Sequence, residues 1–339
     1  MTDLDRLLLE GDLDGLLRLV DDACDDGDWD TLEQIATRSR PAVERGHQLW
    51  PAADHAEHRL ALQAPGSFAA AAVVRDATTF GVAPLAEVAA SSHTWADLEP
   101  HLANAGTRRA VVAHERVARG ADLRGLQLDD DPVGLPLQLA CWEPATDGPT
   151  IGPYGVDDPV PPTGLLAPVA QVPNPKVNES IAGAEADAAR TALRDLVSTW
   201  TEQSRGTATA VAVCGTGPQA AASAGRSIDA GHISIRALAS DEAIGLLAWA
   251  GASGGAHGRR RGAARGRFEA WWCAAALVGL DGPGDDWPPD PNALGNALAD
   301  LRWWRWDSAL RPAGWFLGIA VDDPLDGLAW ALAASDRPS

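Results

Sequence analysis

Lysine is almost absent from this chain, because Lys176 is the only lysine among its 27 basic residues. Methionine and tyrosine occur once each and phenylalanine four times, while alanine is abundant. We interpret this bias as the codon usage of a high-GC genome rather than as a sign of function. Tryptophan departs from the bias, with 14 residues, of which nine lie from Trp249 onward.

Closely spaced cysteines are also missing. The four cysteines are Cys24, Cys141, Cys214 and Cys273. Without a C-x-x-C pair, the usual spacing of a structural zinc site or a redox dithiol is excluded. Free thiols in a reducing compartment are the simplest expectation. We therefore predict no metal and no other cofactor.

Long hydrophobic runs and a positive charge balance are lacking as well. The longest apolar candidate, Trp271 to Leu280, is shorter than the ~18 residues that a membrane-spanning helix needs. The first residues, MTDLDRLLLEGDLD, lack the basic region of a signal peptide. The net charge of −20 repels nucleic-acid phosphates and anionic lipids. We predict a cytoplasmic protein that has neither a membrane nor a nucleic acid as its partner.

The first 123 residues have the apolar spacing of amphipathic helices. Helices are predicted at 3–20 (split near Gly11), 29–39, 42–63, 67–76, 83–90 and 106–119. Such a series is typical of helix pairs that stack as in a solenoid, although no fixed sequence period is present. Residues 1–123 are therefore interpreted as an α-helical region.

A proline-rich connector is predicted at 124–178, where 11 of the 24 prolines fall between Pro132 and Pro175. Proline lacks the amide donor and disfavours helix interiors and central strands. The alternation of Leu135, Leu137, Leu139 and Trp142 nevertheless predicts one edge strand in this segment.

Residues 179–335 mix strand and helix patterns and predict a Trp-rich α/β domain, so the expected fold class is α/β or α+β. Strands are predicted at 207–214 and 232–238, and an antiparallel pair at 302–306 and 314–321. Helices are predicted at 179–203, 240–250, 268–279 and 292–300, with a closing helix from Asp323-Pro324 to about residue 333.

Several longer stretches have a distinctive amino-acid sequence. They are RGHQLWPAADHAEHRLALQAPG, AEVAASSHTWADLEPHL, AHERVARGADL, WAGASGGAHGRRRGAARGRFEAWW, LRWWRWD and GLAWAL. On these stretches, which together cover most of the chain, the protein resembles a group of uncharacterised actinobacterial proteins. The resemblance implies a family and a taxon, and it implies no activity.

A glycine- and arginine-rich loop at 251–267 is the main candidate site, with five arginines in nine positions. Glycines let backbone amides approach an anion, and arginine binds phosphate or carboxylate through two parallel hydrogen bonds. The predicted anion-binding residues are Ser253, His257, Arg259, Arg260, Arg261, Arg265 and Arg267. The alternative is that these arginines pair with the protein's own excess of carboxylates.

Three other motifs are weaker. G-A-S-G-G at 251–255 matches a nucleophile elbow, but a helix is predicted before it and the last histidine of the chain is His257. Residues 215–220 match G-x-G-x-x-A of a dinucleotide site, but a tight strand-to-helix turn explains them better. Asp54 and His58 could face one metal or form an ordinary surface pair.

Clustered indoles form the last candidate site. Trp303, Trp304 and Trp306 lie on the predicted 302–306 strand, whose faces alternate. They predict either core packing or an aromatic recognition surface beside Arg302 and Arg305.

Two functions follow from these observations. The first is a non-catalytic binding protein whose helical array contacts a protein partner. The alternative is an enzyme or sensor that binds a phosphorylated or carboxylated small molecule at the loop 251–267. Convergence of the loop side chains on an open cleft would favour the alternative, whereas pairing with Asp and Glu would oppose it.

Overall fold

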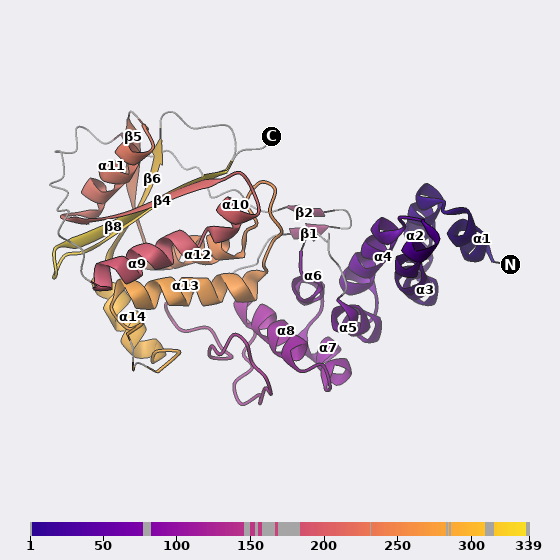
Figure 1. The fold of residues 1–339 in the computed structure, drawn as a ribbon. Helices are drawn as coiled ribbons and strands as arrows, with labels where there is room; N and C mark the ends of the chain where they lie inside the picture. The colour runs from indigo at the N-terminus through magenta and orange to yellow at the C-terminus, as the bar shows by residue number, and fades with distance from the viewer. Residues whose placement is uncertain are drawn as a thin grey trace. The chain divides into compact units, whose positions relative to one another are not determined.

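The computed structural model describes residues 2–76, 83–145, 150–152, 155–157, 167–168, 184–230, 232–282, 284, 286–308 and 315–336. The chain divides into two compact units (Figure 1). The first comprises Met1–Val133 and Asp147–Asp158, and the second comprises Gly134–Thr146 and Pro159–Ser339. Part of the proline-rich segment thus belongs to each unit.

The first unit is an array of helix pairs. Its elements are α1 (Asp3–Glu10), α2 (Leu13–Asp26), α3 (Trp29–Ser39), the 3₁₀ helix η1 (Arg40–Arg45), α4 (Trp50–Gln63), α5 (Gly66–Arg75), α6 (Leu85–Ser92), α7 (Trp95–Leu102), α8 (Thr107–Ala118), β1 (Thr150–Gly152) and β2 (Gly155–Asp157). Helices α2, α4, α6 and α8 contact one another in succession. In the other row, α1 contacts α3 and α5 contacts α7. This arrangement confirms the predicted helix-pair array.

Local signals set the helix boundaries of this unit. Gly11 ends α1 in the left-handed conformation at φ 69°, which a residue without Cβ adopts at little cost. The side chain of Asp28 accepts a hydrogen bond from the Thr31 amide and begins α3. Helix α7 has no counterpart in the sequence prediction, because it is short and contains Pro100.

The second unit is built on a six-stranded antiparallel sheet. Its strands are β3 (Ala167–Pro168), β4 (Thr207–Cys214), β5 (Ile233–Leu238), β6 (Arg302–Ser308), β7 (Trp315–Asp323) and β8 (Leu328–Asp336), in the spatial order β3-β5-β6-β7-β8-β4. Its helices are α9 (Ala184–Asp195), α10 (Ser198–Glu202), α11 (Gly217–Ser227), α12 (Ser240–Ala252), α13 (Ala263–Leu277) and α14 (Pro291–Asp300). The fold is therefore α+β.

Helices cover both faces of this sheet. Helix α11 contacts β4 to β8, while α9 and α12 contact the sheet and α13 packs on both of them. Figure 1 shows α9, α12 and α13 together on one side. The helix before β4 is divided into α9 and α10, whereas the sequence predicted one helix at 179–203.

The predicted hairpin is confirmed, with Trp304 opposite Ala320 and Arg305 opposite Ile319. The predicted closing helix is wrong, because residues 328–336 form strand β8. This strand lies between β7 and β4 and is hydrogen-bonded on both sides. Most of its residues are buried, so it lacks the alternating pattern of a half-exposed strand and its alanines mimic a helix.

The edge strand predicted from Leu135 to Trp142 is also wrong, because that segment is irregular. The carbonyl groups of Pro136 and Gln138 accept hydrogen bonds from the Arg267 guanidinium instead of from a neighbouring strand.

Across the described ranges, none of the helices combines the length and the apolar character needed to cross a bilayer.

The four cysteines are free thiols with different exposure. Burial raises the pKa of the Cys273 thiol, which is fully enclosed, and it also raises the pKa of the half-buried Cys24. Since the thiolate is the reactive form, we expect rapid alkylation of the exposed Cys141 and Cys214, slower alkylation of Cys24, and none of Cys273 before unfolding. Mass spectrometry of timed iodoacetamide labelling checks this order, and early modification of Cys273 would contradict it.

Candidate functional site

The predicted anion loop is shorter than its sequence suggests. Helix α12 ends at Ala252 and α13 begins at Ala263, so the loop spans 253–262 and Arg265 and Arg267 lie on α13. The helix begins five residues earlier than residue 268 because the alanines at its start are strong helix formers. Gly262 precedes it at φ 96°, where glycine is the favoured residue.

Arg267 is a buried ion-pair partner. Its side chain is 4% exposed and that of Glu143 is 3% exposed. The guanidinium Nε donates to Glu143 Oε1 at 2.6 Å and Nη2 to Oε2 at 2.9 Å. Nη1 and Nη2 also donate to the carbonyl groups of Pro136 and Gln138. Trp271 Nε1 donates to Glu143 Oε1 at 2.8 Å. The hydrogen bonds of the Arg267 guanidinium are therefore made to groups of the second unit.

Arg261 and Arg265 share one carboxylate. Arg261 Nη2 lies 2.6 Å from Glu269 Oε1, and Arg265 Nη2 lies 2.7 Å from the same oxygen. The Arg265 guanidinium also lies 4.7 Å from the centroid of the Phe268 ring, a favourable cation–π distance. Three of the five predicted anion-binding arginines (Arg261, Arg265 and Arg267) therefore bind the protein's own carboxylates, as the alternative interpretation expects.

The remaining predicted residues lie on the loop itself. Ser253 is buried and its Oγ accepts a hydrogen bond from the Gly255 amide. His257 is exposed, Arg259 is half-buried and Arg260 is buried. Asp336, at the end of β8, anchors the loop, because its Oδ2 accepts a hydrogen bond from the Ala256 amide.

Close packing at Gly255 completes this anchor. A Cβ added there would lie 2.4 Å from Asp336 Oδ2 and 3.2 Å from Trp200. Ser204 Oγ donates to the second oxygen of Asp336 at 2.9 Å. The glycine is therefore required by packing, without any bound anion.

The two glycine motifs have structural roles. The elbow motif at 251–255 begins in the last turn of helix α12 rather than after a strand. In the other motif, the Gly217 amide at the start of α11 donates to Asp322 Oδ1 at 2.8 Å, and Trp304 Nε1 donates to the same oxygen at 2.7 Å. A carboxylate of the chain thus occupies the helix end where a phosphate would bind in a dinucleotide site.

The predicted aromatic surface lies largely inside the second unit. Trp303 is 2% exposed, Trp306 is fully buried and Trp304 is half-buried. Their indoles therefore serve mainly as core side chains. A second cluster that sequence reasoning missed joins Trp200, Trp249 and Trp315, whose ring centroids lie 5.6–5.9 Å apart. These residues are far apart in the sequence, so no local pattern signals the cluster.

Buried carboxylates in the helix-pair array were also missed. Glu57 on α4, Glu87 on α6 and Glu115 on α8 are each at most 1% exposed. Arg40 and Arg75 pair with Glu57, and Arg119 lies 2.7 Å from Glu115 and 3.6 Å from Glu87. Burial raises the pKa of the Glu57 carboxyl. A glutamate on an otherwise apolar helix face is the sequence signal that could have revealed them.

Asp54, which together with His58 could face one metal, forms an ion pair with an arginine instead. Asp54 Oδ1 accepts a hydrogen bond from Arg40 Nη2 at 2.6 Å, and His58 is buried. No group of three or more His, Cys, Asp or Glu residues in the described part of the chain is arranged to hold a metal ion.

The outer side of the first helices has the most concentrated charge. Residues 1–33 contain twelve Asp and Glu and two Arg, a net of −10 and thus half of the total −20. We define the acidic face as five exposed aspartates: Asp14, Asp22, Asp25, Asp26 and Asp30. None of them forms an ion pair with another described residue. The spacing of the α2 aspartates places them on one side of the helix, around Arg18.

Comparison with known proteins gives a family without an activity. Residues 14–338 match the sequence profile of a family described as a family of unknown function, DUF6183. No curated protein and no solved structure matches the chain.

Proposed function

The chain belongs to this family of unknown function, from which no activity can be transferred, and we propose that it is a non-catalytic interaction protein. Its helix-pair array binds a protein partner that presents a basic segment. The observation that carries the proposal is the acidic face on α2 and α3, whose five exposed carboxylates have no charge partner among the described residues. Repeat arrays of helices offer extended surfaces of this kind to partners.

Electrostatics favours this partner over others. Unpaired carboxylates on one helix side repel each other, and a basic segment relieves that repulsion while it gains charge-assisted hydrogen bonds. Leu9 on the neighbouring α1 is 68% exposed and adds apolar contact area. Complementary charge also accelerates association, and the effect weakens with salt.

A labelled peptide of alternating arginine and serine tests the acidic face. We expect the full chain to bind it, and Asp22→Asn/Asp25→Asn/Asp26→Asn to weaken the dissociation constant by about tenfold or more at low salt, since three complementary charges are lost. Fluorescence anisotropy at two salt concentrations measures this change. The asparagines keep side-chain size, so the fold is preserved.

The matched control removes equal charge elsewhere. Glu202→Gln/Asp241→Asn/Asp286→Asn neutralises three exposed carboxylates of the second unit. This variant should bind the peptide about as well as the wild type. Equal losses in both variants would mean general attraction to an acidic protein, and absence of wild-type binding would contradict the proposal directly.

The alternative function has weaker support. An enzyme or sensor for a phosphorylated or carboxylated molecule at 251–267 would use Arg259, Arg260 and the exposed His257, each of which already has an interaction within the protein. Arg261, Arg265 and Arg267 bind Glu269 and Glu143.

For the interaction protein we further propose a cytoplasmic location and an actinobacterial source, supported by the four free thiols and the codon bias.

A further inference from the structure

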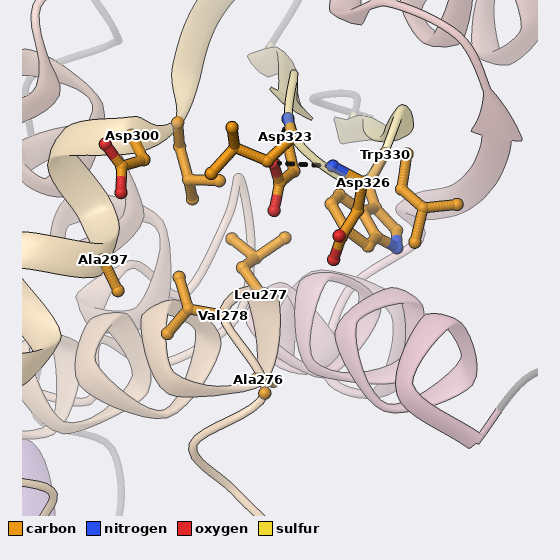
Figure 2. A pocket seen from close by; sticks show the side chains of 12 residues that line it. Ala276, Leu277, Val278, Ala297, Asp300, Asp323, Asp326 and Trp330 are labelled. Carbon is orange, nitrogen blue, oxygen red and sulfur yellow. Dashed lines mark hydrogen bonds between the residues drawn. The ribbon is translucent and has the colours of Figure 1, made fainter.

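A cavity of about 320 Å³ lies in the second unit, whereas the acidic face belongs to the first. It is formed where α13 and α14 end and where β7 turns into β8 (Figure 2). Its volume is in the range of small-molecule sites, which begins at about 300 Å³.

One part of the cavity wall is apolar. Leu277 and Val278 at the end of α13 line it together with the buried ring of Trp330. Leu325, also in the wall, is 80% exposed. An aliphatic side chain with this exposure next to a cavity gives a ligand apolar contact area as it enters. The wall thus suits a chain or ring of carbon atoms.

The polar part of the wall, as far as the structure describes it, is acidic. Asp300, Asp323 and Asp326 line the cavity, and none of the described lining residues is Arg, Lys or His. Figure 2 shows Asp300 and Asp323 above Leu277 and Val278, with the Asp326 carboxylate beside Leu277. Asp323 Oδ1 accepts hydrogen bonds from the Leu325 and Asp326 amides, which fixes its carboxylate in the β7–β8 turn.

The helix ends add to this negative potential. Helix α13 has 15 residues and α14 has 10, and both end at the cavity. The C-terminus of a helix carries partial negative charge, which favours cations. Three carboxylates and two helix ends therefore act in the same direction on any bound group.

We propose that this cavity binds a small organic cation, an ammonium or guanidinium group attached to an apolar chain or ring. The cationic group lies at Asp300, Asp323 and Asp326, and the apolar part lies against Leu277, Val278 and Trp330. The carboxylates are combined with apolar residues rather than with further oxygen ligands, which favours an organic cation over a divalent metal ion.

Isothermal titration of the full chain with n-hexylammonium tests the site, with n-hexanol and n-hexanoate as isosteric probes. We expect saturable binding of the ammonium and none of the carboxylate. Asp300→Asn/Asp326→Asn should weaken ammonium binding by about tenfold or more. Ala297→Phe, which fills part of the cavity from α14, should weaken it as well.

The control Asp241→Asn/Asp286→Asn removes two exposed carboxylates outside the cavity and should leave the dissociation constant unchanged. Circular dichroism confirms that each variant is folded. The proposal would be overturned if n-hexylammonium failed to bind, or if the Asp300→Asn/Asp326→Asn variant bound it as tightly as the wild type. It would also be overturned if Ca²⁺ bound more tightly than the ammonium, or if n-hexanol bound equally well. None of these outcomes bears on the acidic face, which lies in the other unit.

Discussion

Replacing Arg267 with methionine is expected to lower the free energy of unfolding by about 3–5 kcal/mol, because the change leaves a buried carboxylate without its charge partner. Glu143 is 3% exposed and accepts two hydrogen bonds from Arg267. The carbonyl groups of Pro136 and Gln138 lose their donors as well. Urea denaturation followed by tryptophan fluorescence measures the difference.

Arg265→Met is the matched control, because it makes the same substitution on the same turn of α13. Its side chain is 46% exposed and Glu269 keeps its contact with Arg261, so the expected cost is at most about 1 kcal/mol. Adding Glu143→Met to Arg267→Met should recover part of the loss, since the buried charge disappears. Equal effects of the two arginine variants would contradict the structural role of Arg267 and reopen its role in anion binding.

Replacing Asp322 with alanine is expected to lower the free energy of unfolding by about 2–4 kcal/mol, because two donors lose a charged acceptor in the interior. Asp322 is 2% exposed, and its Oδ1 accepts from the Gly217 amide and from Trp304 Nε1. The variant also removes the negative charge at the start of α11. Thermal and urea unfolding measure the loss, and near-ultraviolet circular dichroism reports on Trp304.

Asp322→Asn distinguishes hydrogen bonding from charge. The amide oxygen can still accept from both donors, so this variant should lose less stability than the alanine variant. Asp326→Ala, which removes an exposed carboxylate nearby, should change stability by no more than about 0.5 kcal/mol. A harmless Asp322→Ala variant would show that the start of α11 does not depend on this carboxylate.

Local structure could be predicted well because its causes are local. The cap at Asp28 acts over three residues, and the αL conformation of Gly11 depends only on the missing Cβ. Strand β4 coincides with the predicted range 207–214, where β-branched residues alternate with alanine. The arrangement of helices in pairs could also be predicted from the sequence, since each helix has an apolar face that must pack against a neighbour.

The candidate sites depended on residues that lie far apart. Arg267 and Glu143 are 124 positions apart in the chain, and Gly217 and Asp322 are 105 apart. The sequence showed a surplus of carboxylates that could neutralise the arginines, but spacing cannot say which acid meets which base. The acidic cavity combines the ends of two helices with a turn between strands, and no local motif signals it.

By itself, the sequence determined most of the helices, four of the six strands of the large sheet, the division into a helical part and a part with a sheet, and the strong negative charge. Capping, backbone freedom and apolar spacing act within a few residues, so the chain carries this information locally. Only the tertiary structure decided that residues 328–336 join the sheet and that Arg267 faces Glu143 rather than a ligand. A central strand and a buried ion pair are defined by their partners, which the fold brings together from distant positions.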